Sequence, residues 1–482
     1  MYDPVYQNPT ETWAIRRGRR WEWWRRTTPP QLFAGSFLLL IVLGTLGLRF
    51  LPGLYTGEQL GWLDALFTAT SAVCVTGLIV VDTATYFTTA GQAFLLLLIQ
   101  LGGLGIVTFT TLIILMLGRR ISLRHERVAA GVADVAPHVD FRHLTRDILL
   151  FTFACELAGV LLLYLAWVPD MGLAAAVWPA VFQSISAFCN AGFSTFSDSL
   201  MGMNRQPLPV LTIMLLIVIG GIGFLTMEEL WLRRSHRRRK KRRQTDELVP
   251  RLSLHSKLVL ATSAILILGG WIFFTVYEWQ ITLAGMPAWA RLMNALFMSV
   301  TARTAGFNTI DYSQIADGSG FLTILLMFIG GSPGSTAGGV KTTTIAVIGL
   351  FAWSRYRGRT SAGVLGRTIP EETIQRAVGL FVVGFGVVTL AIFLLTTTEI
   401  GMVSHALAET HFLPYMFEAM SAFSTVGLSM GVTADLSMAG RIVTVLLMYI
   451  GRVGVLTFAA AIALRPRAAG LSRYAHEDVV IG

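Results

Sequence analysis

Long apolar runs alternate with polar segments along the chain, and eight of the runs are long enough to cross a bilayer. A helix needs about 20 consecutive apolar residues to span the hydrocarbon core. Runs of about this length lie near residues 31–50, 91–117, 147–168, 208–232, 257–278, 320–350, 373–396 and 440–464. The pattern therefore predicts an all-α membrane protein with eight transmembrane helices.

Between the two members of each pair of runs lies a half-apolar segment that is too short to cross. These segments cover residues 63–73, 177–188, 291–302 and 413–423. A segment of this length can enter the membrane and return where its broken backbone is buried in protein or faces water. The chain is thus predicted to repeat one unit four times: an outer helix, a short re-entrant helix, a turn and an inner helix.

A glycine ends each short segment, and a second glycine group lies 25, 28, 24 and 24 residues later. Glycine adopts positive φ at no steric cost, so successive carbonyl groups near it can point to one side and replace the water shell of a cation. One such glycine is most simply a turn, but four at matching positions predict a selectivity filter on a pseudo-fourfold central axis. The predicted ion-binding residues are Val75, Thr76, Gly77, Asn190, Ala191, Gly192, Thr304, Ala305, Gly306, Thr425, Val426 and Gly427.

A phenylalanine also stands ten residues before the filter glycine in three of the repeats, at Phe67, Phe182 and Phe417. In the third repeat it is shifted by one position, to Phe297. The third repeat is therefore the irregular one.

The glycine groups of the inner helices have two different explanations. Those around Gly102 and Gly220 can serve close helix packing. The third group cannot be held in a straight helix, and unwound chain at this depth must face protein or a cavity. We therefore expect it to cross the pore below the filter as a movable gate. It consists of Gly330, Gly331, Ser332, Pro333, Gly334, Ser335, Thr336, Ala337, Gly338 and Gly339, followed by Val340 and Lys341.

This segment also looks like a phosphate-binding loop, but Val340 separates the second glycine from the lysine and no strand precedes it. We expect no nucleotide to bind to this chain. Lys341 is expected to reach the cytoplasmic surface.

Arg452 stands at the matching place in the fourth repeat, inside an apolar run. A charge at membrane depth is costly and so indicates a functional site. Arg452 could repel cations on the axis, or it could donate hydrogen bonds to the carbonyl groups of the broken helix and hold the gate shut. Alternatively, Glu156 could neutralise it.

Composition supports a membrane protein, because 54% of the residues are hydrophobic and 14% are charged, against about 25% charged in soluble domains. The net charge of +10 comes from basic residues in every second loop, which places both termini in the cytoplasm. The basic run 233–243 therefore suits topology and the lipid surface better than nucleic acid. No catalytic or metal-ligating cluster stands out, so we expect no enzyme. The outward loops contain Asp64, Asp82, Asp198, Asp311, Asp317 and Asp435, which either raise the local cation concentration or only solvate loop ends.

The chain resembles the pore-forming membrane subunit of the Trk/Ktr/HKT potassium transporter superfamily and is most similar to the KtrB branch. The resemblance runs across residues 31–465 and is strongest in 63–78, 301–309, 331–342 and 421–428. It implies potassium selectivity, since all four filter positions are glycine; a serine in the first copy accompanies sodium permeation in some plant relatives. It also implies that residues 330–341 and Arg452 form the gate.

The same resemblance implies a homodimer in the bacterial inner membrane, docked on a cytosolic ring of nucleotide-binding subunits of the KtrA or TrkA type. Sodium, protons or neither could drive uptake. Three alternatives are the potassium-binding subunit of an ATP-driven pump, a less selective sodium/potassium transporter and a non-conducting receptor or scaffold. The predicted organisation is a basic segment 1–30, repeats 31–120 and 140–234, a basic linker 235–256, repeats 257–352 and 371–465, and a tail 466–482.

Overall fold

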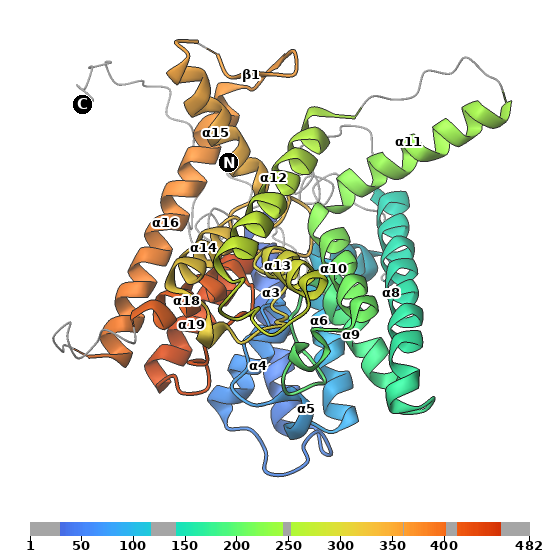
Figure 1. The fold of residues 1–482 in the computed structure, drawn as a ribbon, viewed down its shortest axis with the longest axis vertical. Helices are drawn as coiled ribbons and strands as arrows, with labels where there is room; N and C mark the ends of the chain where they lie inside the picture. Colours follow the sequence, from blue (N-terminus) through green and yellow to red (C-terminus); the bar gives the residue numbers. More distant parts are fainter. Residues whose placement is uncertain (1–28, 117–140, 244–251, 360, 402–411, 455–482) are drawn as a thin grey trace, which may run out of the picture.

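Four long apolar helices, each the first helix of a predicted repeat, form the frame of the molecule (Figure 1). They are α3 (Pro29–Phe50), α8 (Phe141–Met171), α12 (Leu254–Tyr277) and α16 (Glu371–Glu399). All four are long and apolar enough to cross a membrane. The computed structural model describes residues 29–116, 141–243, 252–359, 361–401 and 412–454. Residues 1–28 of the predicted basic segment, residues 244–251 of the predicted link 235–256 and the whole predicted tail 466–482 lie outside these ranges.

A short helix follows each outer helix, at the four places where the sequence predicts a re-entrant segment. These helices are α4 (Trp62–Cys74), α9 (Val177–Cys189), α13 (Ala288–Thr301) and α18 (Phe412–Ser424). Their last turns are almost completely buried. The hydrophobic pattern therefore located these helices to within a few residues.

The inner helices differ from the prediction, because the first and second are interrupted as well as the third, and in the fourth the regular helix stops at Val453, next to the last described residue. The inner helix α6 (Thr89–Met116) kinks at Gly105, where φ is 66°. Helix α10 (Pro207–Ile222) stops at Gly223, and α11 (Phe224–Arg243) continues after a bend of 99°. Helices α14 (Asp317–Phe328) and α15 (Thr342–Tyr356) flank the third break, and α19 (Met438–Val453) ends at Gly454.

These breaks change the count of membrane spans. By length and composition the described residues contain four spanning helices, or five if the bent pair α10 and α11 is one span. Eight continuous spans are therefore not found in the described residues. A glycine at positive φ, Gly105, Gly223 or Gly454, stands where the regular helix ends in three of the inner runs, and in the third repeat α14 ends at Phe328, before the unwound segment.

In three repeats a polar side chain connects the carboxyl-terminal end of the outer helix to the start of the inner helix. Gln206 Nε2 donates to Asp170 at 3.2 Å in the second repeat. The backbone N–H groups of Ala316 and Ser437 donate to Glu278 and Glu399 at 3.0 and 2.9 Å in the third and fourth. Small elements fill the connections: α5 (Thr83–Tyr86), η1 (Met201–Met203), η2 (Tyr312–Gln314) and the antiparallel pair β1 (Gly363–Val364) and β2 (Arg367–Thr368).

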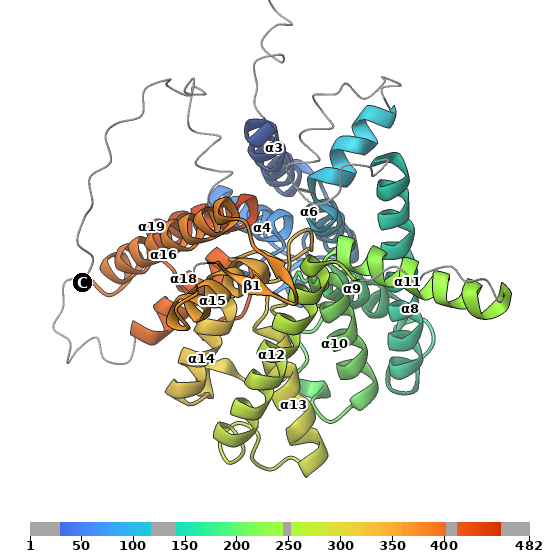
Figure 2. The same cartoon turned by 90° about the horizontal axis from the view of Figure 1, so that it is seen from above.

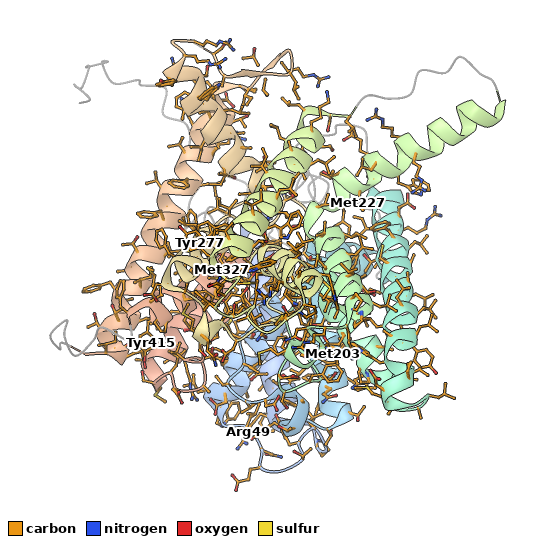
Figure 3. The ribbon with its side chains drawn as sticks, in the orientation of Figure 1. Arg49, Met203, Met227, Tyr277, Met327 and Tyr415 are labelled. Carbon is orange, nitrogen blue, oxygen red and sulfur yellow. The ribbon has the colours of Figure 1, made fainter. Side chains whose placement is uncertain are left out.

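The inner helix of each repeat contacts the short helix of the next, in an order that closes on itself. The pairs are α6 with α9, α10 with α13, α14 with α18, and α19 with α4. In Figure 2 the outer helices follow one another around the molecule from α3 through α8 and α12 to α16. Met327 of α14, labelled in Figure 3, is fully buried within this arrangement.

Candidate functional site

The four predicted filter glycines lie against one another at the centre of this arrangement. A Cβ atom added at Gly77 would lie 2.4 Å from the carbonyl oxygen of Ala191, and one added at Gly192 would lie 2.9 Å from that of Ala305. At Gly306 the distance to Val426 O is 2.4 Å, and at Gly427 the distance to Thr76 O is 2.1 Å. Each turn thus contacts the next, and the fourth contacts the first. No side chain fits at any of the four positions without moving a neighbouring backbone.

Residues of positive and negative φ alternate in each turn. The residue two positions before the filter glycine has a φ between 50° and 75° in all four repeats, although none of these residues is glycine. The residue between this position and the glycine does not have positive φ, whereas the glycine does. Since successive carbonyls of an extended strand point to opposite sides, alternation of φ brings them to one side. The residues concerned are Val75, Asn190, Thr304 and Thr425.

Left-handed backbone is unfavourable for β-branched residues such as Val75 and Thr425. It persists here because the short helix ends at these residues. The Val75 N–H donates to Ala72 O at 3.1 Å and the Thr76 N–H donates to Ser71 O at 2.8 Å. The turn that exposes the carbonyl groups is therefore built as the carboxyl-terminal cap of the short helix.

A hydroxyl on each short helix holds the turn, and sequence reasoning missed it. Ser71 Oγ and Ser421 Oγ accept from the N–H groups of Gly77 and Gly427 at 3.1 and 3.0 Å. Ser186 Oγ and Thr301 Oγ1 instead donate to the carbonyls of Phe193 and Phe307. Three of the four hydroxyl residues lie six residues before the glycine, and Thr301 lies five before it. The one-residue shift already seen for Phe297 could therefore have identified these residues from the sequence.

The side chains of the filter residues separate into two kinds. Asn190, with its amide nitrogen turned inward, donates to Ile217 O at 3.2 Å and to Ala187 O at 3.1 Å, so its polar group serves its own repeat. The hydroxyls of Thr76, Thr304 and Thr425 are buried and have no hydrogen-bond partner within the described part of the chain.

Three inner helices pack closely against the short helix of their own repeat, and a glycine stands at each contact. A Cβ added at Gly102 would lie 1.9 Å from Val73 O, at Gly220 2.0 Å from Phe188 O, and at Gly451 1.7 Å from Phe423 O. Each of these carbonyl oxygens is in the last turn of the short helix of the same repeat. The fixed spacing between the two glycine groups is explained by this contact.

The unwound segment 330–341 lies directly beneath the filter turns. A Cβ added at Gly338 would lie 2.1 Å from Thr425 Oγ1. On the other side, Thr336 Oγ1 donates to Gly220 O at 3.2 Å, and the Ser332 N–H donates to Gly221 O at 3.1 Å. The segment therefore touches both the second and the fourth repeat.

Arg452 links this segment to the first repeat. Its guanidinium donates hydrogen bonds to the carbonyl oxygens of Thr336 and Gly102. Within the described residues there is no ion pair between Arg452 and Glu156; the carboxylate of Glu156 instead accepts from Gln100 Nε2 at 3.0 Å. Of the roles considered for Arg452, hydrogen bonding to the unwound segment matches the geometry.

Lys341 was expected to extend to the cytoplasmic surface, but its side chain stays within the segment. Its Nζ folds back and donates to Ala337 O at 2.6 Å. The ammonium group thus helps to hold the turn within the segment, because a buried cation needs carbonyl partners.

Several of the acids that the sequence predicts to lie in outward loops stabilise local structure. Asp64 forms an ion pair with Arg441 of α19. Asp82 accepts from the Ala84 N–H at 3.0 Å, and Asp311 accepts from the Ser313 N–H at 2.9 Å. These contacts favour the simpler of the two explanations for the acids. Across the residues that the structure describes, no group of three His, Cys, Asp or Glu side chains could hold a metal ion.

Comparisons with known proteins agree on one relationship. The family model described as TrkH, cation transport protein, matches residues 27–470. Potassium/sodium uptake protein NtpJ of Enterococcus hirae is 37% identical over 463 residues, which is 95% of this chain and 98% of that protein. Ktr system potassium uptake protein B of Bacillus subtilis is 38% identical over 435 residues, which is 90% of this chain and 93% of that protein.

Among solved structures, the potassium transporter TrkH from Vibrio parahaemolyticus has the same fold. The TM-score is 0.68 at 18% sequence identity, covering 89% of this chain and 83% of the other.

Proposed function

We propose that this chain, which belongs to the TrkH family of cation transport proteins, takes up potassium through a gated pore at the centre of its four repeats. It is a multi-pass membrane protein of the Trk/Ktr superfamily. The observation that carries the proposal is the closed order of contacts among Gly77, Gly192, Gly306 and Gly427. Four backbone turns that meet in this way supply carbonyl oxygens from all sides of one axis.

In this proposal potassium is the substrate, and the backbone carbonyls of the twelve predicted filter residues replace its water. Each short helix directs its carboxyl end, the negative pole of the helix dipole, toward the same place. The unpartnered hydroxyls of Thr304 and Thr425 are additional oxygen ligands at the inner end. Eight helical passes, in four pairs around a pseudo-fourfold axis, would complete the pore.

Residues 330–341 form the gate in this scheme, and Arg452 holds it closed. Support comes from the position of the segment against Thr425 and Gly220 and from the two hydrogen bonds of the guanidinium. Opening requires the loss of these bonds, each worth about 1.5–3 kcal/mol because the donor is charged. A partner that binds the open state more tightly can supply this free energy.

We further propose that the protein works as a homodimer in the bacterial inner membrane, with both termini cytoplasmic, and that a nucleotide-binding ring of the KtrA or TrkA type opens the gate. The relatives named Ktr system potassium uptake protein B support this assignment. We also propose that the basic run 233–243 determines topology and acts at the anionic lipid surface on the cytoplasmic side.

A second candidate is a less selective transporter that also carries sodium. It is favoured by one observation, the similarity to a protein named for both potassium and sodium uptake. Sodium would then be a second substrate or a coupling ion.

Replacement of Gly77 by serine tests the proposed filter. In liposomes that contain the purified protein, the parent should pass potassium in preference to sodium, and Gly77→Ser should lower this ratio. A parent that passes both ions equally would establish the second candidate. An unchanged ratio in the variant, with unchanged growth of potassium-uptake-deficient cells at limiting potassium, would count against the filter.

A further inference from the structure

The second and the fourth repeat each contain a hydrogen bond from the short helix to the chain that follows the filter glycine. Gln183 and Glu418 each stand nine residues before the filter glycine, on the short helices α9 and α18, and neither has any exposed surface. Gln183 Nε2 donates to Ser194 Oγ at 2.5 Å, and Ser429 Oγ donates to Glu418 at 2.8 Å. Both serines lie two residues after the filter glycine. A buried side chain on the helix thus reaches the outer end of the filter strand.

Each serine also fixes the turn that follows it. The Phe196 N–H donates to Ser194 Oγ at 3.0 Å, and the Gly431 N–H donates to Ser429 Oγ at 3.1 Å. Glu418 accepts a further hydrogen bond from Thr433 Oγ1 at 2.7 Å. The contact therefore holds a whole outer loop to the short helix in each of these two repeats.

The first and third repeats lack this contact. The first has Thr68 at the same position, and its hydroxyl is buried without a hydrogen-bond partner among the described residues. The third repeat, with its one-residue shift, has Met298. In the closed order of glycine contacts the second and fourth turns are not neighbours. Held turns therefore alternate with turns that are not held in this way.

We propose that Gln183 and Glu418 are positioning residues that set ion specificity by holding two non-adjacent filter turns at a fixed spacing. The inference rests on the proposed function, because a filter rejects sodium only while its carbonyl groups resist closing around the smaller ion. Hydrogen bonding performs this role and negative charge does not, since the neutral amide at position 183 also bonds to the serine two residues after the filter glycine, as the donor, where the carboxyl group at 418 is the acceptor.

The test compares potassium and sodium flux through full-length protein in vesicles of phosphatidylethanolamine and phosphatidylglycerol. Glu418→Gln should keep the potassium-to-sodium ratio within about twofold of the parent, because its amide can donate to Ser429, whereas Glu418→Leu and Gln183→Leu should each lower it about tenfold. Thr68→Val is the matched control: it changes the same helix position in the first repeat and should leave the ratio unaltered. A purely structural role would reduce both fluxes together and leave their ratio constant.

Two outcomes would overturn the inference. One is a Glu418→Leu protein as selective as the parent, and the other is a Glu418→Gln protein as unselective as Glu418→Leu, which would assign the effect to charge. If the leucine variants do not fold, Ser194→Ala and Ser429→Ala remove the same contacts from the other side and should give the same tenfold loss. Gly77→Ser, measured in parallel, separates the two proposals: if it lowers the ratio and the leucine variants do not, only the positioning role fails.

Discussion

Alanine substitutions at the four filter glycines give a graded test of the contact order. Cβ atoms essentially never lie within 3.0 Å of a non-bonded heavy atom, and the atom added at Gly427 would lie 2.1 Å from Thr76 O. At Gly192 the same distance is 2.9 Å from Ala305 O. The neighbouring turn must therefore move by about 1 Å for the first variant and by very little for the second.

The free-energy cost follows from two terms. Overpacking costs about 1–3 kcal/mol, and positive φ costs a residue with a Cβ about 1–2 kcal/mol. These two costs lower the stability of the fold, whereas selectivity changes because the carbonyl group of Thr76 is displaced. A tenfold change in the flux ratio corresponds to a difference of about 1.4 kcal/mol between the two ions, and we expect Gly427→Ala to lower the potassium-to-sodium flux ratio by about this factor. Gly77→Ala and Gly306→Ala should be intermediate, and Gly192→Ala should have the smallest effect.

The assay is ion flux in liposomes, with thermal unfolding of each variant measured in detergent. Gly379→Ala is the control, because it lies in α16 and nothing is within 4 Å of the added Cβ. The reasoning is refuted if Gly427→Ala is as selective as Gly379→Ala. A larger loss at Gly192 than at Gly427, at equal thermal stability, would refute the contact order alone.

Three further predictions concern the gate, the inner helices and the outer surface. Arg452→Ala should raise potassium flux without any cytosolic partner by about tenfold or more, because it removes two charge-assisted hydrogen bonds; flux no higher than in the parent would exclude a closed gate held by Arg452. Gly451→Ala should lower the melting temperature in detergent, because its Cβ would lie 1.7 Å from Phe423 O, whereas Gly349→Ala, with nothing within 4 Å, should not. Asp64→Asn should lower the free energy of unfolding by less than about 1 kcal/mol, because the side chains of Asp64 and Arg441 in this ion pair are 29% and 23% exposed. Potassium flux through the variant should match that of the parent. A large fall in flux would show that Asp64 concentrates cations.

The short helices and the glycine turns that follow them could be predicted because their signals are local and repeated. A short half-apolar segment that ends in glycine is ambiguous once, but four copies at similar spacing leave one arrangement that buries them all. The third break was evident for the same reason, since Pro333 and its neighbouring glycines exclude a helix.

The other breaks could not be predicted, because glycine is tolerated within helices and its φ is decided by tertiary contacts. Gly105, Gly223 and Gly454 lie in groups that close packing explains equally well, yet each adopts positive φ. A hydrogen bond from Arg452 to the broken helix was among the predicted roles, but its second partner, Gly102 O, and the partner of Lys341, Ala337 O, could not be predicted, because a backbone carbonyl carries no side-chain signature.

The contact between Gly427 and Thr76 has a consequence for how the protein is made. These residues belong to the last and first repeats, so the closed order of contacts among the four turns is incomplete until almost the whole chain has been translated. A nascent protein stalled after three repeats would lack the piece that completes the circle. Under the proposed function, translation products that stop after three repeats therefore cannot form a complete ion path across the membrane.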